Sequence, residues 1–212
     1  QGGEDQEVQQ GAISNQTWDL EGFFIDGLTL SMVGGWDFNT AGISGYTSGD
    51  IFISLGAPIY CSVNPPTLPD QSDPFFASDL GYDYVIDINN WSGGTAYDVY
   101  EVVAGQTLAS EVAVGQFEND SNPFEYAGEA GGATNTAIAS GNYTNTEGLT
   151  DAQTGFLGGT HNKVGFDLSW LLTEILNHPD DPYEGDIYFH FTMECGNDMM
   201  MGKINARDFT PP

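Results

Sequence analysis

Basic residues are almost missing from this 212-residue chain. Lysine and arginine together number 3, against 31 aspartates and glutamates, and the formal net charge at pH 7 is −28. Binding to nucleic-acid backbones or to anionic membrane surfaces depends on Lys and Arg, so both functions are excluded. Because a surface with so many unpaired carboxylates repels itself at low salt, we expect an acidic habitat, high ionic strength or divalent cations.

Long apolar runs are also missing. No stretch approaches the roughly 20 residues that a membrane-spanning helix requires, so we expect no membrane span. The chain begins at Gln1 without a methionine, a basic segment or an apolar stretch, as expected after removal of a signal peptide. With 40% hydrophobic and 13% aromatic residues it has enough apolar material for a core. These features predict a secreted protein of the cell surface or extracellular matrix.

The apolar pattern indicates many short strands. Residues 187–195 alternate between apolar and polar side chains, as half-buried strands do, and Asp26-Gly27 is a turn signal between two shorter runs. Residues 50–55 are apolar on both faces, which predicts a central strand. On the 187–195 strand His190 falls on the polar face, where we expect an ordinary surface hydrogen bond.

Only one segment has convincing helical spacing. Apolar residues recur at i, i+3, i+4, i+7 and i+8, namely Leu168, Leu171, Leu172, Ile175 and Leu176. Pro179 stops any continuation, so we expect one short amphipathic helix near 168–177. Together with 28 glycines between short strands, this pattern indicates an all-β fold, a β-sandwich or jelly roll.

The chain divides into a polar N-terminal segment and one domain. Residues 1–16 are rich in Gly, Gln and Glu, and we expect them to be exchanged with a neighbouring subunit that orders them. Residues 17–212 then form a single β-sandwich domain. Within it, residues 127–159 contain few large apolar side chains. Because a bare loop of that length is rare in compact domains, we expect partial strand structure or a subunit contact there.

The chain has two cysteines, Cys61 and Cys195, each on the apolar face of its predicted strand. In a secreted protein they would form a disulfide that closes a large loop and stabilises the fold by roughly 4–5 kcal/mol on the chain-entropy model. The alternative is two buried, inert thiols, because sequence alone does not show whether the sulfur atoms meet.

Recognisable catalytic and zinc-binding motifs are missing. The histidines, His161, His178 and His190, form no His-x-x-x-His pair, no cysteine pair has zinc-ligand spacing, and no Gly-x-Ser-x-Gly sequence occurs. The densest group of oxygen ligands is a Pro- and Gly-containing turn with four carboxylates, Asp180, Asp181, Glu184 and Asp186. Such turns suit calcium, which is therefore the predicted metal, with a merely solvated acidic loop as the alternative.

Four Asn-x-Ser/Thr sequences occur in or near turn-rich stretches, at Asn15, Asn90, Asn119 and Asn142. Each is a predicted glycosylation site if the source organism modifies such asparagines. Chance matches in an Asn- and Thr-rich chain are the alternative.

Residues 190–198, with the sequence His-Phe-Thr-Met-Glu-Cys-Gly-Asn-Asp, resemble a run in the extracellular β-sandwich proteins that bacteria sort by exosortase, the PEP-CTERM type. Residues 159–161 and 166–171 are similar to the segment that usually precedes this run. The resemblance implies a secreted, surface-associated or biofilm-matrix protein that is not a known enzyme. The family's sorting tail is missing, since the chain ends at Thr-Pro-Pro in residues 210–212, so the mode of anchoring stays open.

We therefore expect a non-enzymatic structural protein, the subunit of a cell-surface filament or biofilm matrix. In this homopolymer the N-terminal segment or an early strand adds to an open sheet edge of the next copy. One alternative is a calcium-dependent carbohydrate-binding module for exopolysaccharide, in which Trp36, Trp91 and Trp170 offer stacking faces. The competing interpretation is that Trp170 packs under the helix and that the other two tryptophans lie in the core. Another is a secreted acid hydrolase, for which the many carboxylates are suited.

Overall fold

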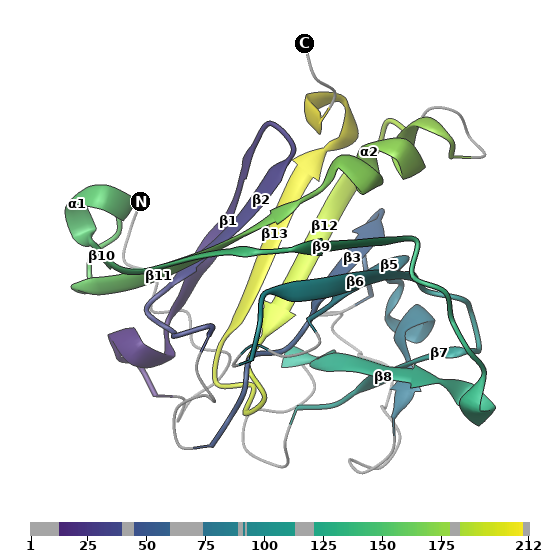
Figure 1. The fold of residues 1–212 in the computed structure, drawn as a ribbon, viewed down its shortest axis with the longest axis horizontal. Helices are drawn as coiled ribbons and strands as arrows, with labels where there is room; N and C mark the ends of the chain where they lie inside the picture. The colour runs from purple at the N-terminus through teal and green to yellow at the C-terminus, as the bar shows by residue number, and fades with distance from the viewer. Residues whose placement is uncertain are drawn as a thin grey trace.

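Strands dominate the computed structural model, which describes residues 13–39, 45–59, 74–88, 91, 93–112, 121–178 and 183–209. They pair into three antiparallel sheets (Figure 1). The predicted all-β sandwich is confirmed. Among the described residues no helix combines the length and the hydropathy needed to cross a membrane.

The three sheets differ in size. The four-stranded sheet has the order β1 (Leu20–Asp26), β2 (Thr29–Gly34), β11 (Thr160–Asp167) and β10 (Thr144–Thr150). The six-stranded sheet has the order β13 (Met199–Asn205), β12 (Asp186–Thr192), β3 (Ile51–Leu55), β5 (Tyr84–Asp87), β6 (Ala96–Glu101) and β9 (Ala139–Asn142). The three-stranded sheet has the order β4 (Phe75–Phe76), β7 (Thr107–Ser110) and β8 (Glu125–Glu129).

Short helical elements lie between the strands. The α-helices are α1 (Asp151–Thr154) and α2 (Ser169–Leu176), and the 3-10 helices are η1 (Gln16–Trp18), η2 (Ala77–Leu80), η4 (Ala130–Gly132) and η5 (Ala206–Phe209). Helix α2 falls within the predicted 168–177 and buries Leu171 and Ile175, as its apolar stripe requires.

The hairpin of β1 and β2 follows from two local signals. The predicted turn at Asp26-Gly27 joins the strands, and Gly27 has a φ of +59°, a conformation that glycine adopts without strain. In β1 the pairing register shifts between Leu20 and Gly22, so Glu21 is the extra residue of a β-bulge. A bulge bends its strand and redirects a side chain, here that of Glu21.

The main core lies between the four- and six-stranded sheets. Leu30 and Phe166 come from the first sheet and Ile53 and Phe189 from the second, and all are buried. Strand β3 confirms its predicted central place. Ile53 faces this core, whereas Phe52 belongs to a second cluster on the opposite face of the sheet.

That second cluster changes the environment of β12. Phe52 packs with Phe75 of β4 and Ala109 of β7, so the three-stranded sheet covers part of the far face of the six-stranded sheet. His190 and Thr192 lie on this face, and both are 0% exposed. The predicted surface position of His190 is therefore wrong, because a third layer buries the polar face of its strand.

Residues 127–159 confirm the expected partial strand structure. They contain most of β8, all of β9 and β10, and the short helices η4 and α1. Strands β9 and β10 run along the edges of two different sheets, with only Tyr143 between them.

Candidate functional site

The predicted calcium ligands lie just before and at the start of β12. Two of them are outside the described residues, Asp180 and Asp181. Glu184 forms an ion pair with Arg207, and Asp186 accepts a hydrogen bond from Lys203 at 3.0 Å. The hydrogen bond from Lys203 holds the pKa of Asp186 below its usual value. In the described part of the chain no group of three or more His, Cys, Asp or Glu side chains is arranged to hold a metal ion. Calcium binding at the turn stays a prediction.

Cys195 lies in the loop after β12 and is buried. Burial raises the pKa of its thiol to about 11, so near neutral pH it is protonated and a poor nucleophile. Cys61, the predicted disulfide partner, lies outside the described residues, and the disulfide stays a prediction.

The loop after β12 anchors the start of the chain. The Asn197 side chain accepts a hydrogen bond from the Ile13 backbone N–H at 2.7 Å and donates one to the Ile13 carbonyl at 3.1 Å. One carboxylate oxygen of Asp198 accepts from the Leu20 N–H at 2.7 Å. Residues 13–20 are therefore bonded to this loop within one chain.

The same loop binds two further segments. Glu194 accepts hydrogen bonds from the backbone and the hydroxyl of Thr47, at 2.9 and 3.1 Å. The Ser121 hydroxyl donates to the Gly196 carbonyl at 2.9 Å. The run that carries the resemblance to sorted surface proteins thus joins three segments far apart in sequence, which is a structural task.

Of the four predicted glycosylation sites, two lie outside the described residues, Asn90 and Asn119. Asn15 is exposed and its side chain accepts from the Thr17 backbone N–H at 3.2 Å. Asn142 is exposed at the end of β9 and accepts from the Thr95 hydroxyl at 3.0 Å. Glycosylation stays a prediction at all four.

Two of the three tryptophans considered for sugar stacking are not available to a ligand. Trp36 is 0% exposed and donates its indole N–H to the Ser48 hydroxyl at 2.8 Å. Trp91 is 6% exposed and donates to the Gly49 carbonyl at 3.0 Å. For both, the alternative of a core position is confirmed, because their rings lie in the main core. Trp170 packs partly buried against that core.

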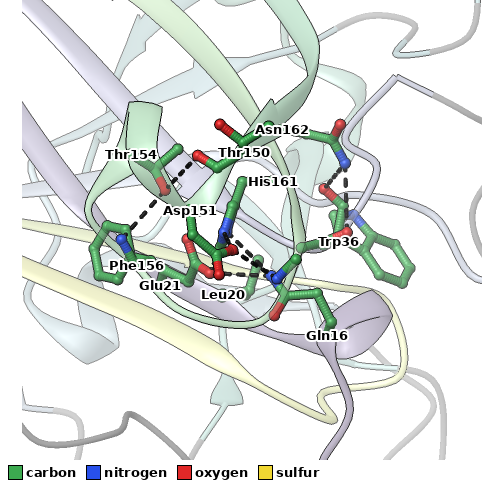
Figure 2. A network of polar contacts seen from close by, with 12 residues as sticks. Gln16, Leu20, Glu21, Trp36, Thr150, Asp151, Thr154, Phe156, His161 and Asn162 are labelled. Atoms are coloured by element: carbon green, nitrogen blue, oxygen red, sulfur yellow. Dashed lines mark hydrogen bonds and ion pairs between the residues drawn. The ribbon is translucent and has the colours of Figure 1, made fainter.

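His161 lies at the centre of a polar network on the outer face of the four-stranded sheet (Figure 2). Its ring is 0% exposed, with Nδ1 2.6 Å from a carboxylate oxygen of Glu21 and Nε2 3.0 Å from one of Asp151. The Gln16 amide nitrogen lies 3.1 Å from the same Glu21 oxygen. Three elements, η1, β1 and α1, therefore meet on one imidazole of β11.

The two carboxylates of this network differ in environment. The Glu21 side chain is 2% exposed, and its second oxygen is buried without a hydrogen-bond partner. Burial raises the pKa of Glu21. Asp151 is more exposed, and its hydrogen bonds with His161 and the Gly159 N–H lower its pKa. With both ring nitrogens occupied and the ring buried, His161 is closed to substrate.

A second acidic group lies where β3 begins. Asp50 is 4% exposed and accepts hydrogen bonds from the backbone N–H groups of Ile88 and Tyr126, both at 2.8 Å. Burial, with the nearby charge of Asp87, raises the pKa of Asp50 well above its usual value. Burial also raises the pKa of Asp87 to about 6. Asp50 thus links the six- and three-stranded sheets through its backbone partners.

The surface feature most suited to a partner is the edge ribbon, defined as residues 139–150. It comprises β9 and β10, and among the described strands each has a neighbour on one side only, β6 and β11 respectively. Between them Tyr143 is 3% exposed, and its hydroxyl bonds to oxygens of Asn39 and Gly94, both at 2.9 Å. This anchor fixes both edges on the same side of the sandwich.

The opposite side of the sandwich is packed by side chains. There β1 and β13 are the outer strands, and they contact each other. The Phe23 ring lies so close over Gly202 that a Cβ on that glycine would be 2.9 Å from the ring side chain. Of the two sides, the edge ribbon is therefore the open one.

Sequence reasoning missed the partners of His161. Glu21 is 140 residues and Asp151 10 residues away in sequence, and neither falls in a recognisable motif. The only available signal was Gly22, which suggests the bulge that turns Glu21 toward the histidine. No family model matches the chain, and no curated protein or solved structure is significantly similar to it.

Proposed function

We propose that the protein is a non-enzymatic structural protein, secreted to the cell surface or extracellular matrix. Copies associate into a filament or biofilm matrix by adding a strand to the edge ribbon of a neighbour. The observation that carries this proposal is that the ribbon overlaps a long run of uncharged residues in a strongly acidic chain.

Charge decides where two copies can meet. Each copy carries a formal −28, yet residues 130–146 contain no charged side chain at all. This run includes β9 and the first half of β10. Because repulsion between copies is weaker where carboxylates are fewer, the uncharged side chains of the ribbon favour close approach there, although Asp98 of β6 lies beside Ser140.

The ribbon lacks several of the usual protections of sheet edges, although the β10 pairing contains a register shift between Thr146 and Leu149. Natural edges are blocked by lysine, proline, inward-pointing charges or a covering loop. Residues 139–150 contain no lysine and no proline, and their one charged side chain is Glu147. Ile138, just before the ribbon, is 43% exposed. An added strand would bond to the free backbone groups and cover this side chain.

The burial of three reactive side chains supports a structural role. His161, His190 and Cys195 are all buried. The loop after β12 forms hydrogen bonds with segments distant in sequence, as described above. The strand donor is expected in residues 1–12, because residues 13–20 are bonded to their own chain.

The test compares two variants, one with a negative charge added to the edge ribbon and one with a negative charge added to an interior strand. Thr146→Glu adds a carboxylate to β10, and Thr29→Glu adds one to β2, an exposed threonine of an interior strand in the same sheet. Assembly is followed by electron microscopy and sedimentation. We expect Thr146→Glu to raise the critical concentration on the order of tenfold, about 1.4 kcal/mol per contact, and Thr29→Glu to leave it near that of the unchanged protein. Equal effects of both variants would reject the edge ribbon as the contact.

Cations are expected to bridge the acidic surfaces away from the ribbon. A chelator at low salt should then loosen the assembly, and added calcium or high salt should restore it. Deleting residues 1–12 separately tests the strand donor. Unimpaired assembly after the deletion would reject that segment as the donor while leaving the ribbon open to another strand.

A second candidate is a secreted acid hydrolase, favoured by the carboxyl group of Asp87. Its pKa of about 6 lies in the range of a general acid, and the nearby Glu125 also has a raised pKa because of burial. Activity of the purified protein on casein or polysaccharides at pH 3–5, lost in Asp87→Asn, would favour this function over the structural one.

A further inference from the structure

The outer face of the four-stranded sheet carries an apolar patch that is separate from the edge ribbon. Phe24 of β1 is 44% exposed and points away from the core, against which its neighbours Phe23 and Ile25 pack. Its ring centre lies 5.7 Å from that of Phe156, in the segment after α1. Leu157 is 86% exposed, the highest value for a large apolar side chain in the described part of the chain. Exposed apolar side chains gathered in one place are typical of binding surfaces.

The segment that carries Phe156 is held against the sheet. Its backbone N–H donates to the Thr154 hydroxyl at 3.2 Å (Figure 2). The Asp151 carboxylate, at the start of the same segment, lies 3.0 Å from the ring of His161 on β11. A ligand would therefore meet an aromatic surface that is already formed, which reduces the entropy lost on binding.

Two hydroxyl groups converge beside the aromatic rings. Ser31 of β2 pairs with Phe24 on one side and with Gly165 of β11 on the other, and Gly165 pairs with Thr144 of β10. A Cβ on Gly165 would lie 3.7 Å from Ser31 Oγ and 2.8 Å from Thr144 Oγ1, so both hydroxyls border the space above this glycine.

The Ser31 hydroxyl is unused by the fold. The residue is 6% exposed, yet in the part of the chain that the structure describes its hydroxyl has no hydrogen-bond partner. A hydroxyl both donates and accepts, and a polar group so placed gains from a ligand that supplies the missing bond.

A basic side chain lies on the same face. Lys203 and Arg207 each pair with a carboxylate, whereas Lys163 is exposed and forms no ion pair with any described residue. Lys163 lies two residues from Gly165 on β11, so the two positions share the outer face. In a chain with a formal charge of −28, a cation without an acidic partner favours a ligand that carries negative charge.

The spacing of these groups suits a short oligosaccharide. Phe24 and Lys163 lie on strands that β2 separates, about 10 Å apart across the sheet at the usual strand spacing. An aromatic ring stacks on the apolar C–H face of a sugar, hydroxyls bond to sugar hydroxyls, and an ammonium group pairs with a carboxylate. A uronic acid unit offers all three partners.

We propose that the outer face of the four-stranded sheet binds an acidic polysaccharide built from uronic acid units. Phe24 and Phe156 form the stacking surface, Ser31 bonds to a sugar hydroxyl, and Lys163 binds the carboxylate. The site would attach the protein to an acidic matrix polymer whether or not copies associate through the edge ribbon.

Calorimetric titration of the full-length protein with tetragalacturonate tests the site. EDTA excludes bridging by cations, and about 0.15 M salt screens long-range repulsion. We expect Lys163→Gln to weaken binding on the order of tenfold, and Lys203→Gln on β13 to leave it unchanged. Phe24→Ala should weaken it by a similar factor, and Leu176→Ala, exposed on α2, should not. No binding by the unchanged protein, or equal losses within either pair of variants, would overturn the proposal.

Two further measurements test the hydroxyl and the charge separately. Because the Ser31 hydroxyl has no partner among the described residues, Ser31→Ala should leave thermal unfolding unchanged and weaken binding on the order of threefold. The methyl ester of the tetrasaccharide lacks the negative charges, so it should bind more weakly and be insensitive to Lys163→Gln. Unchanged binding by Ser31→Ala, or an ester that binds as tightly as the acid, would contradict the site.

A peptide with the sequence of residues 1–12 tests the alternative occupant, a segment of a neighbouring copy. It contains three acidic side chains and could also pair with Lys163. We expect it to bind more weakly than tetragalacturonate. If it binds more tightly and loses affinity in Lys163→Gln, the face receives a second copy of the chain and not a polysaccharide.

Discussion

The regions around His161 and His190 solve the problem of a buried histidine in opposite ways. His161 is covered by the α1 segment and contacts two carboxylates. His190 lies under the three-stranded sheet, where its Nε2 is 3.0 Å from the Pro123 carbonyl and its Nδ1 is 3.1 Å from the Met201 sulfur. In the first region the ring contacts acidic side chains, and in the second it contacts a carbonyl oxygen and a thioether. The same residue type is therefore buried against carboxyl groups in one place and against neutral groups in the other.

The largest expected effect is that of removing the ring between the carboxylates. His161→Ala leaves the buried Glu21 carboxyl without its contact to the ring, and we expect the free energy of unfolding at pH 6 to fall by about 3–5 kcal/mol. Urea unfolding measures this loss. The double variant His161→Gln with Glu21→Gln removes both charges and should lose only about 1 kcal/mol. Equal losses in both variants would show that packing, not the orphaned carboxylate, sets the cost.

The next effect is acid destabilisation through His190. Burial lowers the pKa of His190 to about 4 from the usual 6.5. The unfolded chain therefore binds the proton first, and the stability contributed by the neutral ring is present above pH 6.5 and lost as the pH falls through 4. The difference of about 2.5 pH units corresponds to about 3 kcal/mol.

Urea unfolding at pH 7 and at pH 4 checks this, with His190→Gln as the comparison. The variant should lose the part of the pH dependence that the ring supplies, although it starts from a lower stability. A variant that keeps the full acid sensitivity of the parent would assign the effect to other groups.

The contrast between the two histidines also shows which features of the fold can be predicted from the sequence. The central place of β3 and the position of helix α2 were both predictable, because the apolar spacing of residues 50–55 and 168–177 is a local property of the sequence. The burial of His190 was not, because the three-stranded sheet of β4, β7 and β8 covers part of that face of the six-stranded sheet. Alternation along a strand tells which residues share a face, but the layers that cover each face are decided by contacts distant in sequence.

The candidate site was predictable to a similar degree. The small-residue segment 127–159 was expected to form strands or a subunit contact, and it supplies the edge ribbon. That β9 and β10 would be edges of two different sheets depends on their partners β6 and β11, which no local pattern specifies. The partners of His161 lie on β1 and α1, and only the finished fold brings them together.

A smaller effect is expected from the loop after β12, which belongs to the His190 side of the comparison. Asp198 accepts two backbone hydrogen bonds, from Leu20 at 2.7 Å and from Met199 at 2.8 Å. Asp198→Ala removes both acceptors and should cost about 2 kcal/mol, whereas Asp198→Asn keeps one and should cost about 1 kcal/mol. Thermal unfolding measures both. If Asn were as harmful as Ala, charge rather than hydrogen bonding would dominate here.

The smallest expected effect is that of Asp87, which lies on the same sheet as His190 and changes stability with pH in the opposite direction. Burial, reinforced by Asp98 and Glu125, raises the pKa of Asp87 to about 6. The folded chain therefore binds this proton more tightly than the unfolded chain, and the stability so contributed is present below pH 4 and lost as the pH rises through 6. Asp87→Asn should accordingly increase the free energy of unfolding at pH 7 by about 1 kcal/mol, a value reduced for solvent screening, and leave it unchanged at pH 4. Urea unfolding at the two pH values measures the difference, with Asp26→Asn in the exposed β1–β2 turn as the neutral control. A gain of the same size at both pH values would mean that the substitution acts through packing and not through the charge of Asp87.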